Sequence, residues 1–273
     1  MQTWVNGQVL LDPQAPVIGV TDHGLTVGDG VFEALKVVDG RPFALTRHLA
    51  RLERSAAALR LPAPDLAAVR EGVRAVLAAE HLPLGRIRIT MTGGPSPLGS
   101  GRGDGRPTVV VAAAPLSAGA ATTAVHPVPW PRNERGVLAG VKSTSYAENV
   151  VALAEAVEHG ASEAVFANLA GHLCEGTGSN IGYVLDGQVR TPTLASGCLA
   201  GITRALLLEW YDVQEVDEPI EVLDDAQEVF LLSTTRDVQG VHRYGDRELD
   251  APGPVTRELQ QLWATREAEN PDP

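Results

Sequence analysis

Lysine is rare in this chain, and one of its two copies lies where a reactive amine could be placed. Lysine occurs only at Lys36 and Lys142, so nearly all of the 22 basic residues are arginine. An arginine stays protonated, whereas a lysine amine can lose its proton and attack a carbonyl carbon. Lys142 ends an apolar stretch and precedes a predicted helix. The pattern fits either a catalytic amine or a solvated surface lysine, and the count by itself leaves both interpretations open.

Three further segments carry groups that could bind a flat, anionic ligand. Glu175 lies in the small-residue segment 174–180, where a carboxylate can approach a ring and stabilise a positive charge on it. Residues 201–203 begin an apolar helix, and the N–H groups and positive dipole end of a helix bind phosphate. Residues 233–235 bear hydroxyls and follow a predicted strand, so they could complete an anion site. Taken singly, each segment is better explained as a turn or a capped helix.

The elements that position these groups form two successive patterns. Strands alternate with amphipathic helices up to residue 117, interrupted by a long Gly/Pro-rich loop at 93–107. Such a long loop in a compact domain is usually functional or disordered. From residue 118 onward, short strands dominate. We therefore predict an α+β protein with a smaller N-terminal α/β domain, 1–117, and a strand-rich C-terminal domain, 118–273.

The expected elements follow from periodicity and from turn and cap signals. Asn6-Gly7 and Asp39-Gly40 predict hairpins, and Thr46 and Asp65 are predicted helix N-caps. Strands are predicted at 5–11, 30–38, 86–92, 108–114, 163–168, 181–185, 188–191 and 228–232. Helices are predicted after Thr46, after Asp65, at 146–157, from about 203 and at about 255–266.

Composition argues against several kinds of partner. The net charge of −12 disfavours nucleic acid and anionic membranes, because both need a basic face. No apolar stretch is long enough to span a bilayer, and the first residues lack the basic start and apolar run of a signal peptide. Cys174 and Cys198 have neither a disulfide pattern nor a metal-ligand spacing, which favours a reducing compartment. We therefore expect a cytoplasmic protein that acts on a small molecule.

Taken together, these segments resemble the class IV aminotransferases, the fold-type IV enzymes that use pyridoxal 5'-phosphate. The resemblance runs in order and spacing along nearly the whole chain. It covers DHGLTVGDGVFEALKVVDG at 22–40, RHLARL at 47–52, Lys142, EGTGSN at 175–180, ASGCLAGITR at 195–204 and STT at 233–235. It implies a two-domain fold with a pseudo-barrel C-terminal domain and the cofactor at the domain junction. It also implies a homodimer in which the long Gly/Pro loop reaches the neighbouring subunit's site.

The resemblance implies a role for each matched residue. Lys142 would form the Schiff base with the cofactor and move a proton at the substrate alpha carbon. Glu175 would keep the pyridine nitrogen protonated, which makes the ring an electron sink. Arg51 would pair with the phosphate as a charged fork, and Leu199 would pack on the ring. The other implied cofactor-binding residues are Ser179, Asn180, Gly201, Ile202, Thr203, Ser233 and Thr234. The candidate substrate contacts are Phe32, Lys36, Arg102, Thr235 and Arg236.

Within this family, three reactions compete. The strand at 32–37 and the EGTGSN segment look most similar to D-amino acid transaminases. This implies a D-amino acid as amino donor and a 2-oxo acid such as 2-oxoglutarate or pyruvate as acceptor. The alternatives are a branched-chain amino acid aminotransferase and an aminodeoxychorismate lyase, which forms 4-aminobenzoate and pyruvate. Lyase members often carry Thr where this chain has Glu33, which disfavours that alternative.

The partner of the substrate carboxylate is open at this stage. D-amino acid transaminases commonly place an Arg-x-His pair after Ser-Pro in the long loop, where this chain has Leu98-Gly99-Ser100. A carboxylate in a sheltered site needs a cationic partner, and Arg102, Arg106 or Arg236 could serve. Each of these arginines is equally well explained as a solvated loop charge.

Two hypotheses lie outside this enzyme class. A non-catalytic binding protein on the same fold would be expected to lose Lys142 or Glu175, and neither is lost. A metal-dependent hydrolase could use Asp22, His23 and His48, but these residues lack any ligand spacing on a helix or strand. We therefore predict no metal site.

Overall fold

The computed structural model describes residues 1–12 and 15–273, and these form two compact units. The N-terminal unit comprises Met1–Ala118, Val141–Tyr146 and Pro271–Pro273, and the C-terminal unit comprises Gly119–Gly140 and Ala147–Asn270. The division into domains at residues 117 and 118 stays a prediction. The packing adds one point that the sequence did not indicate, because Val141–Tyr146, which carries Lys142, belongs to the N-terminal unit. In the part of the chain that is described, no helix combines the length and apolar character needed to cross a membrane.

The N-terminal unit is built on an antiparallel sheet of six strands in the order β2-β1-β6-β5-β3-β4. Both predicted hairpins are confirmed: Asn6 and Gly7 have φ of 45° and 99°, and Asp39 and Gly40 have φ of 47° and 72°. Two successive positive φ values suit the twist of a two-residue hairpin. The strands are β1 (Gln2–Val5), β2 (Gln8–Val9), β3 (Gly30–Val38), β4 (Arg41–Pro42), β5 (Leu84–Thr92) and β6 (Thr108–Pro115).

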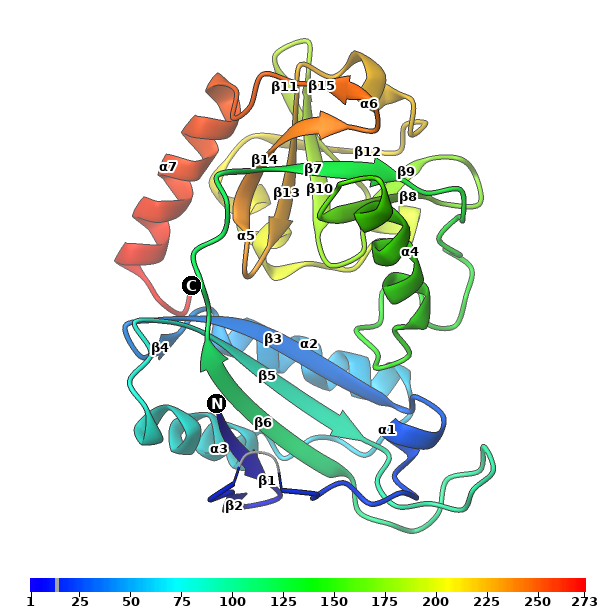
Figure 1. Cartoon of the computed structure of the whole chain (residues 1–273), viewed down its shortest axis with the longest axis vertical. Helices are drawn as coiled ribbons and strands as arrows, with labels where there is room; N and C mark the ends of the chain where they lie inside the picture. Colours follow the sequence, from blue (N-terminus) through cyan, green and yellow to red (C-terminus); the bar gives the residue numbers. More distant parts are fainter. Residues whose placement is uncertain (13–14) are drawn as a thin grey trace. The chain divides into compact units, whose positions relative to one another are not determined.

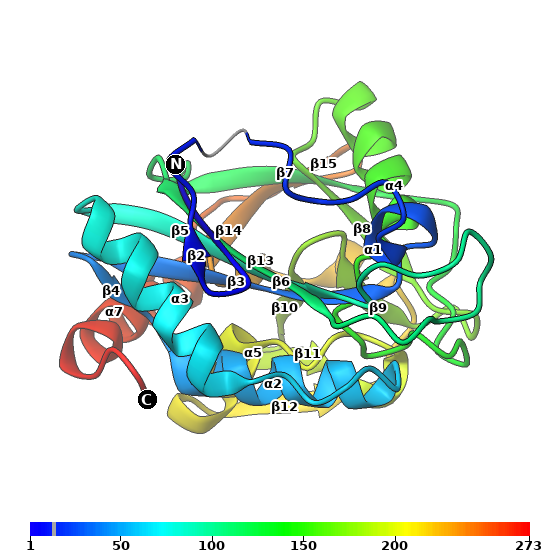
Figure 2. The same cartoon turned by 90° about the horizontal axis from the view of Figure 1, so that it is seen from below.

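Two helices cover one face of this sheet (Figures 1 and 2). They are α2 (Leu45–Ala58) and α3 (Leu66–Ala79), and a short helix, α1 (His23–Thr26), precedes β3. The Asp65 side chain caps α3 by accepting the Ala68 N–H at 3.0 Å, as predicted. The predicted N-cap at Thr46 is wrong, because α2 already begins at Leu45. Thr46 instead donates its N–H and its hydroxyl to Asp272.

Strand alternation gives β3 two chemically different faces. Val31 and Leu35 are fully buried in the core beneath the helices, where they pack with Ile87 and Ile89 of β5. Successive side chains on a strand point to opposite faces. Phe32 therefore lies on the other face of the sheet, whereas Glu33 shares the core face. The sheet thus separates an apolar, helix-covered side from a side that carries Phe32 and polar residues.

The C-terminal unit is a mixed sheet of nine strands in the order β12-β11-β10-β13-β14-β7-β8-β9, with β15 paired to β14. The strand β9 also lies against β10, so the sheet curves back on itself. The strands are β7 (Thr122–Pro127), β8 (Glu163–Ala167), β9 (Leu173–Gly176), β10 (Asn180–Leu185), β11 (Gln188–Pro192), β12 (Val213–Val216), β13 (Glu228–Ser233), β14 (Asp237–Tyr244) and β15 (Arg247–Glu248). The helices are α4 (Ala147–Glu158), the 3-10 turn η1 (Leu194–Ser196), α5 (Ile202–Trp210), α6 (Val222–Asp225) and α7 (Pro254–Glu269).

The predicted fold class is confirmed, and one local prediction is corrected. The mixed α/β composition, the strand-rich second sheet and the solved structures reported below define a two-domain fold-type IV architecture. Glu175 was expected on a small-residue loop, but it belongs to the strand β9. Pairing with β8 explains the difference, because Glu175 lies opposite Phe166 in an antiparallel ladder. Neighbouring strand pairing outweighed the local turn propensity of the segment.

Candidate active site

Lys142 packs on the edge of β3 in the N-terminal unit. Its carbonyl accepts the N–H of Phe32 at 3.0 Å, and Ser143 forms an isolated bridge with Val31. The Lys142 Nζ atom lies 4.5 Å from the centroid of the Phe32 ring. The Tyr146 ring meets Phe32 edge-on, with centroids 5.4 Å apart and planes at 81°. These contacts hold the only lysine outside β3 against an aromatic surface.

Sequence reasoning did not single out Arg88, which contacts the Phe32 ring. It lies on β5, and its guanidinium carbon is 3.8 Å from the centroid of the Phe32 ring. Arg88 is exposed to solvent along part of its length, and its partial desolvation lowers its pKa, although the group remains a cation at neutral pH. The alternation at 86–92 already placed Arg88 on the face opposite Ile87 and Ile89. What the sequence could not give is that Phe32 and Lys142 share this face with it.

A fully buried charge cluster lies on the core side of β3. Arg51 donates to Glu33 through Nε at 2.8 Å and through Nη2 at 2.7 Å, and Nδ1 of His48 lies 2.7 Å from Glu33 Oε2. Burial would raise the pKa of Glu33, but the charge and hydrogen bonds of Arg51 and the hydrogen bond of His48 outweigh it and hold that pKa at about 2. Burial also lowers the pKa of His48, against the opposing effect of Glu33. Glu33 thus fixes the direction of the Arg51 guanidinium.

Glu175 is held by two partners in the C-terminal unit. Its Oε2 accepts the backbone N–H of Leu199 at 2.9 Å, and its Oε1 lies 3.3 Å from Nε of Arg132. Arg132 in turn stacks over the Phe166 ring at 4.1 Å, with Phe166 next to Glu175 across the strand pair. Sequence reasoning also missed Arg132, because no local pattern links it to Glu175. The carboxylate is therefore oriented from both of its oxygens.

The start of α5 lies beside Glu175's partner Leu199. The N-cap is Gly201, which has no side chain to occupy the first helical N–H groups. The Asn180 amide donates to the carbonyl of Leu199 at 2.8 Å, and a Cβ added at Gly201 would collide with the Asn180 side-chain oxygen. Asn180, Gly201, Ile202, Thr203 and Ser179 are all buried. The structure thus gathers Leu199 with these five predicted cofactor residues in one unit.

The segment after β13 was expected to bind ligands, but its arginine binds other groups of the protein. Ser233, Thr234 and Thr235 are half-buried at the turn into β14. Arg236, a candidate for the substrate carboxylate, donates to Gln239 at 2.5 Å and to the Ser162 carbonyl at 3.1 Å, and its Nη2 lies 3.3 Å from Glu163. A substrate carboxylate would have to compete with these partners. The geometry therefore gives Arg236 a structural role within the C-terminal unit.

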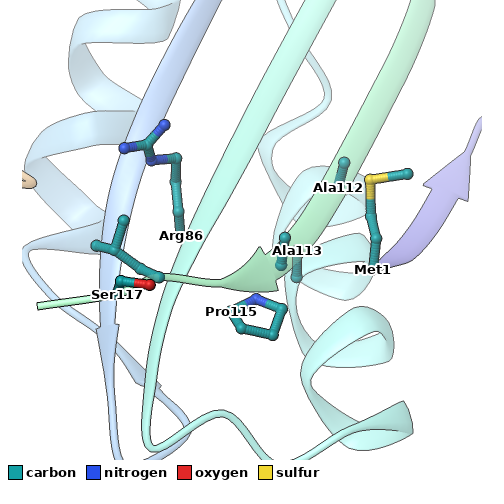
Figure 3. Close-up of a pocket in the computed structure, with 8 residues that line it drawn as sticks. Met1, Arg86, Ala112, Ala113, Pro115 and Ser117 are labelled. Carbon is teal, nitrogen blue, oxygen red and sulfur yellow. The ribbon is translucent and has the colours of Figure 1, made fainter.

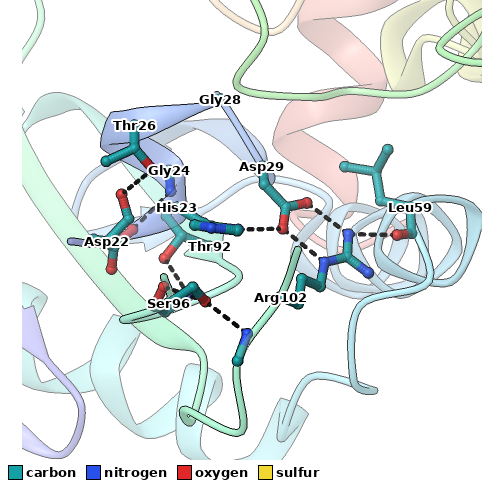
Figure 4. Close-up of polar contacts among 12 residues, drawn as sticks. Asp22, His23, Gly24, Thr26, Gly28, Asp29, Leu59, Thr92, Ser96 and Arg102 are labelled. Carbon is teal, nitrogen blue, oxygen red and sulfur yellow. Dashed lines mark hydrogen bonds and ion pairs between the residues drawn. The ribbon is translucent and has the colours of Figure 1, made fainter. Parts of the chain in front are cut away.

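The long Gly/Pro loop is fastened to the N-terminal unit by Arg102 (Figure 4). Arg102 donates to Asp29 through Nε at 2.7 Å and Nη2 at 2.6 Å, and it also donates to the carbonyls of Leu59 and Arg60 at the end of α2. The hydrogen bond from Arg102 lowers the pKa of Asp29. His23 also contacts the loop, through the Pro97 carbonyl at 3.1 Å. These bonds occupy four N–H groups of Arg102, which makes it a loop anchor.

The candidate metal ligands Asp22, His23 and His48 each bind different groups of the protein. Asp22 caps α1 through the Gly24 N–H at 2.8 Å and accepts the Thr108 hydroxyl at 2.6 Å. His23 and His48 have the partners described above, so the hypothetical hydrolase triad is not assembled. A shallow pocket elsewhere in the N-terminal unit is lined by Met1, Arg86 and residues 112–117 (Figure 3), and none of the predicted site residues lines it.

The fold and these residues define a class of enzyme, and the chain belongs to a known family. Residues 30–244 match the amino-transferase class IV family, and the chain is a member of it. It is 31% identical to a protein of Methanocaldococcus jannaschii provisionally named a branched-chain-amino-acid aminotransferase, over 96% of this chain and 95% of that protein. It is 30% identical to the D-alanine aminotransferase of Staphylococcus haemolyticus, over 95% of both chains. A bifunctional aminodeoxychorismate lyase and D-amino acid transaminase of Mycobacterium tuberculosis is 29% identical, over 91% of this chain and 93% of that protein.

Solved structures agree with the family. The fold IV transaminase CpuTA1 of Curtobacterium pusillum is 32% identical, with a TM-score of 0.86 over 96% of this chain and 93% of its own. A Mycobacterium tuberculosis protein described as a hypothetical aminotransferase, in its PLP-bound form, is 26% identical, with a TM-score of 0.87 over 97% of this chain and 98% of its own. This protein is therefore a pyridoxal-phosphate-dependent aminotransferase of class IV.

The residues described above are chemically suited to bind pyridoxal phosphate. The uncapped start of α5 at Gly201 offers backbone N–H groups of the kind that bind a phosphate. The Glu175 carboxylate is oriented by Leu199 and Arg132, as a group facing a ring nitrogen must be. Lys142 of the N-terminal unit would supply the amine.

Proposed function

We propose that this aminotransferase moves an amino group from a D-amino acid to a 2-oxo acid such as 2-oxoglutarate or pyruvate. The observation that carries the proposal is the shared contact of an amine and a guanidinium with one ring: Lys142 Nζ lies 4.5 Å and the Arg88 guanidinium 3.8 Å from the centroid of Phe32. A reactive amine and a cation able to bind a carboxylate are the two groups that an amino acid substrate requires. The similarity to a D-alanine aminotransferase supports the D-configuration.

The chain's own residues divide the chemistry between them. Pyridoxal phosphate, when bound, supplies an electron sink for the carbanion at the substrate alpha carbon. We assign Lys142 Nζ as the amine that binds the cofactor and as the base that removes and returns the alpha proton. Glu175 would keep the pyridine nitrogen of the bound cofactor protonated, and the Leu199 N–H and Arg132 fix the direction of the Glu175 carboxylate.

Phosphate binding is assigned to two groups. The backbone N–H groups of Ile202 and Thr203 lie in the first turn of α5, where the helix dipole favours an anion. Arg51 adds a guanidinium whose direction is fixed by Glu33 through two hydrogen bonds. The hydroxyls of Ser233 and Thr234 stay as further proposed donors.

We assign the substrate carboxylate to Arg88 in place of Arg102 and Arg236, because those two are held by Asp29 and by Glu163 and Gln239. The test compares D-alanine with a primary amine that has no carboxylate. For Arg88→Gln we expect kcat/KM for D-alanine to fall about 10- to 100-fold, as the loss of a charged hydrogen bond of about 1.5–3 kcal/mol implies.

The same Arg88→Gln substitution should leave turnover of the carboxylate-free amine within about twofold. Arg86→Gln is the matched control, because Arg86 lies two residues away on the same strand and is exposed. An equal loss for both substrates, or an equal effect of Arg86→Gln, would remove Arg88 from this role.

The assignment of Lys142 is tested by borohydride reduction of the holoenzyme followed by peptide mass mapping. A phosphopyridoxyl group is expected on Lys142, and Lys142→Ala should lose both the cofactor absorbance and turnover. Lys36→Arg serves as the control, since it removes the other lysine amine and keeps the charge. A modified Lys36, or near wild-type turnover in Lys142→Ala, contradicts the assignment.

The main alternative is the aminodeoxychorismate lyase reaction, because one relative is named as both lyase and D-amino acid transaminase. Both reactions use the same cofactor groups and differ in the bond that breaks. Pyruvate formation from D-alanine and 2-oxoglutarate supports the transaminase. Pyruvate and 4-aminobenzoate release from aminodeoxychorismate, without half-reactions with D-amino acids or branched-chain L-amino acids, supports the lyase.

We also propose a homodimer. The helix α4 exposes Val150, Val151 and Val157, which are 62%, 54% and 60% accessible. Clustered exposed apolar side chains of this size mark association surfaces. Light scattering of the holoenzyme should give twice the mass of one chain, and Val150→Asp together with Val157→Asp should shift it towards the monomer. A monomeric wild-type enzyme would contradict the proposal.

A further inference from the structure

Three side chains able to bind a metal ion meet in the C-terminal unit, apart from the proposed cofactor residues. They are His126 of β7, Glu155 of α4 and His159, which follows the end of α4. One ligand atom from each lies within 4.8 Å of the other two. The imidazole rings of His126 and His159 stack, with centroids 3.9 Å apart and planes at 9°. His126 and Glu155 are half-buried and His159 is exposed, so an ion has access from solvent.

The hydrogen bonding of His159 prepares one nitrogen for a ligand. Its Nδ1 lies 2.9 Å from the backbone carbonyl of Glu155, which can only accept, so Nδ1 carries the proton. The neutral ring then presents its lone pair on Nε2. A bond of this kind on the second ring nitrogen is what orients metal-binding histidines in proteins.

The charges around the three ligands are compatible with a cation. The Arg243 guanidinium is directed to the carbonyls of His159, Gly160 and Gly245. The protein as a whole carries a net charge of −12, which also favours cations.

We propose that His126, Glu155 and His159 bind a divalent transition-metal ion, with Zn²⁺ as the representative ion. Two imidazoles and one carboxylate, with a water in the fourth position, form a familiar open zinc ligand set. The three ligand atoms lie no more than 4.8 Å apart, so side-chain rotations can bring them within a zinc bond of about 2.0–2.2 Å.

Binding also requires one imidazole to turn. Lone pairs lie in the ring planes, and two rings stacked at 9° cannot both direct them to one ion. Because the bond from Nδ1 to the Glu155 carbonyl holds the His159 ring, the ring that turns is that of His126, and the torsion about the Cβ–Cγ bond of a histidine is broad. The bound ion would join β7 to the end of α4 and so stabilise the C-terminal unit.

The test uses untagged holoenzyme, treated with a chelator and then titrated with Co²⁺ and with Zn²⁺. Co²⁺ should produce visible absorption bands of a low-coordinate site, and Zn²⁺ should displace it and raise the Tm. His159→Gln and Glu155→Gln should each weaken Co²⁺ binding about tenfold or more. His172→Gln, a half-buried histidine of the same unit outside the cluster, is the matched control.

Each outcome decides the proposal. Unchanged binding in His159→Gln, or an equal loss in His172→Gln, would place the ion elsewhere. No Co²⁺ spectrum at about 1 mM metal would mean that the three groups do not form a site of useful affinity. Should His126→Gln fail to fold, His159→Gln and Glu155→Gln still decide, because the His159 and Glu155 side chains are 48% and 33% accessible. The transaminase assays are independent of this result.

Discussion

Replacing Glu33 by Gln tests the buried charge cluster on the core side of β3. The substitution keeps the shape of the side chain and removes the charge that faces Arg51 and His48. Lowering the pKa of Glu33 from its ordinary 4.5 to about 2 corresponds to about 3 kcal/mol of stabilisation of the charged form. Leaving Arg51 buried without its anion costs a similar amount, about 3–5 kcal/mol. Because 1 kcal/mol shifts Tm by about 2–4 °C in a protein of this size, we expect a loss of about 3–5 kcal/mol in Glu33→Gln to lower the Tm by about 6–20 °C.

The pH dependence gives the same prediction a second measurement. A carboxylate whose pKa is lowered by folding contributes stability that is present above the unfolded value of about 4.5 and lost as the pH falls towards about 2. The Tm of the wild type should therefore fall more steeply than that of Glu33→Gln over this interval, and the two curves should converge. Glu53→Gln on the exposed side of α2 is the matched control, expected within about 0.5 kcal/mol of the wild type.

A Glu33→Gln protein with the Tm of the wild type would refute the reasoning, as would pH curves that stay parallel. Either result would mean that groups other than the Glu33 carboxylate stabilise the buried charge of Arg51. Thermal unfolding followed by far-UV circular dichroism over a pH series is sufficient for both measurements.

Three more predictions follow from single contacts. Asp29→Asn should weaken the contact that holds Arg102 by about 1 kcal/mol and speed tryptic cleavage at Arg106 several-fold. Asp104→Asn is the control. Equal cleavage rates in the wild type and Asp29→Asn would show that other contacts hold the loop. Gly201→Ala should displace Asn180 and weaken cofactor affinity about tenfold in a fluorescence titration. The control is Gly119→Ala, whose added Cβ meets open space and should leave the affinity unchanged. Unchanged affinity in Gly201→Ala would refute the close packing of Gly201 against Asn180. Gly72→Ala should lower the Tm despite better helix propensity, because its Cβ would lie 2.8 Å from Trp4, and a raised Tm would contradict this.

The sequence by itself determined much of the secondary structure and the order of the motifs. Some signals act over only a few residues and can therefore be recognised in the sequence. Examples are the alternation at 86–92, the turn at Asp39-Gly40 and the cap at Asp65. The order of Lys142 and Glu175 among the small-residue motifs was sufficient to indicate the family, which the comparisons then showed.

Tertiary structure decided which charged groups meet. The sequence offered Arg102 and Arg236 as carboxylate partners, but the fold gives them Asp29 and Glu163, and it brings Arg88 to Phe32 instead. These pairs are separated by tens of residues, and strand register and helix packing select among many possible partners. Periodicity tells on which face a side chain lies and says nothing about what the rest of the chain brings to that face.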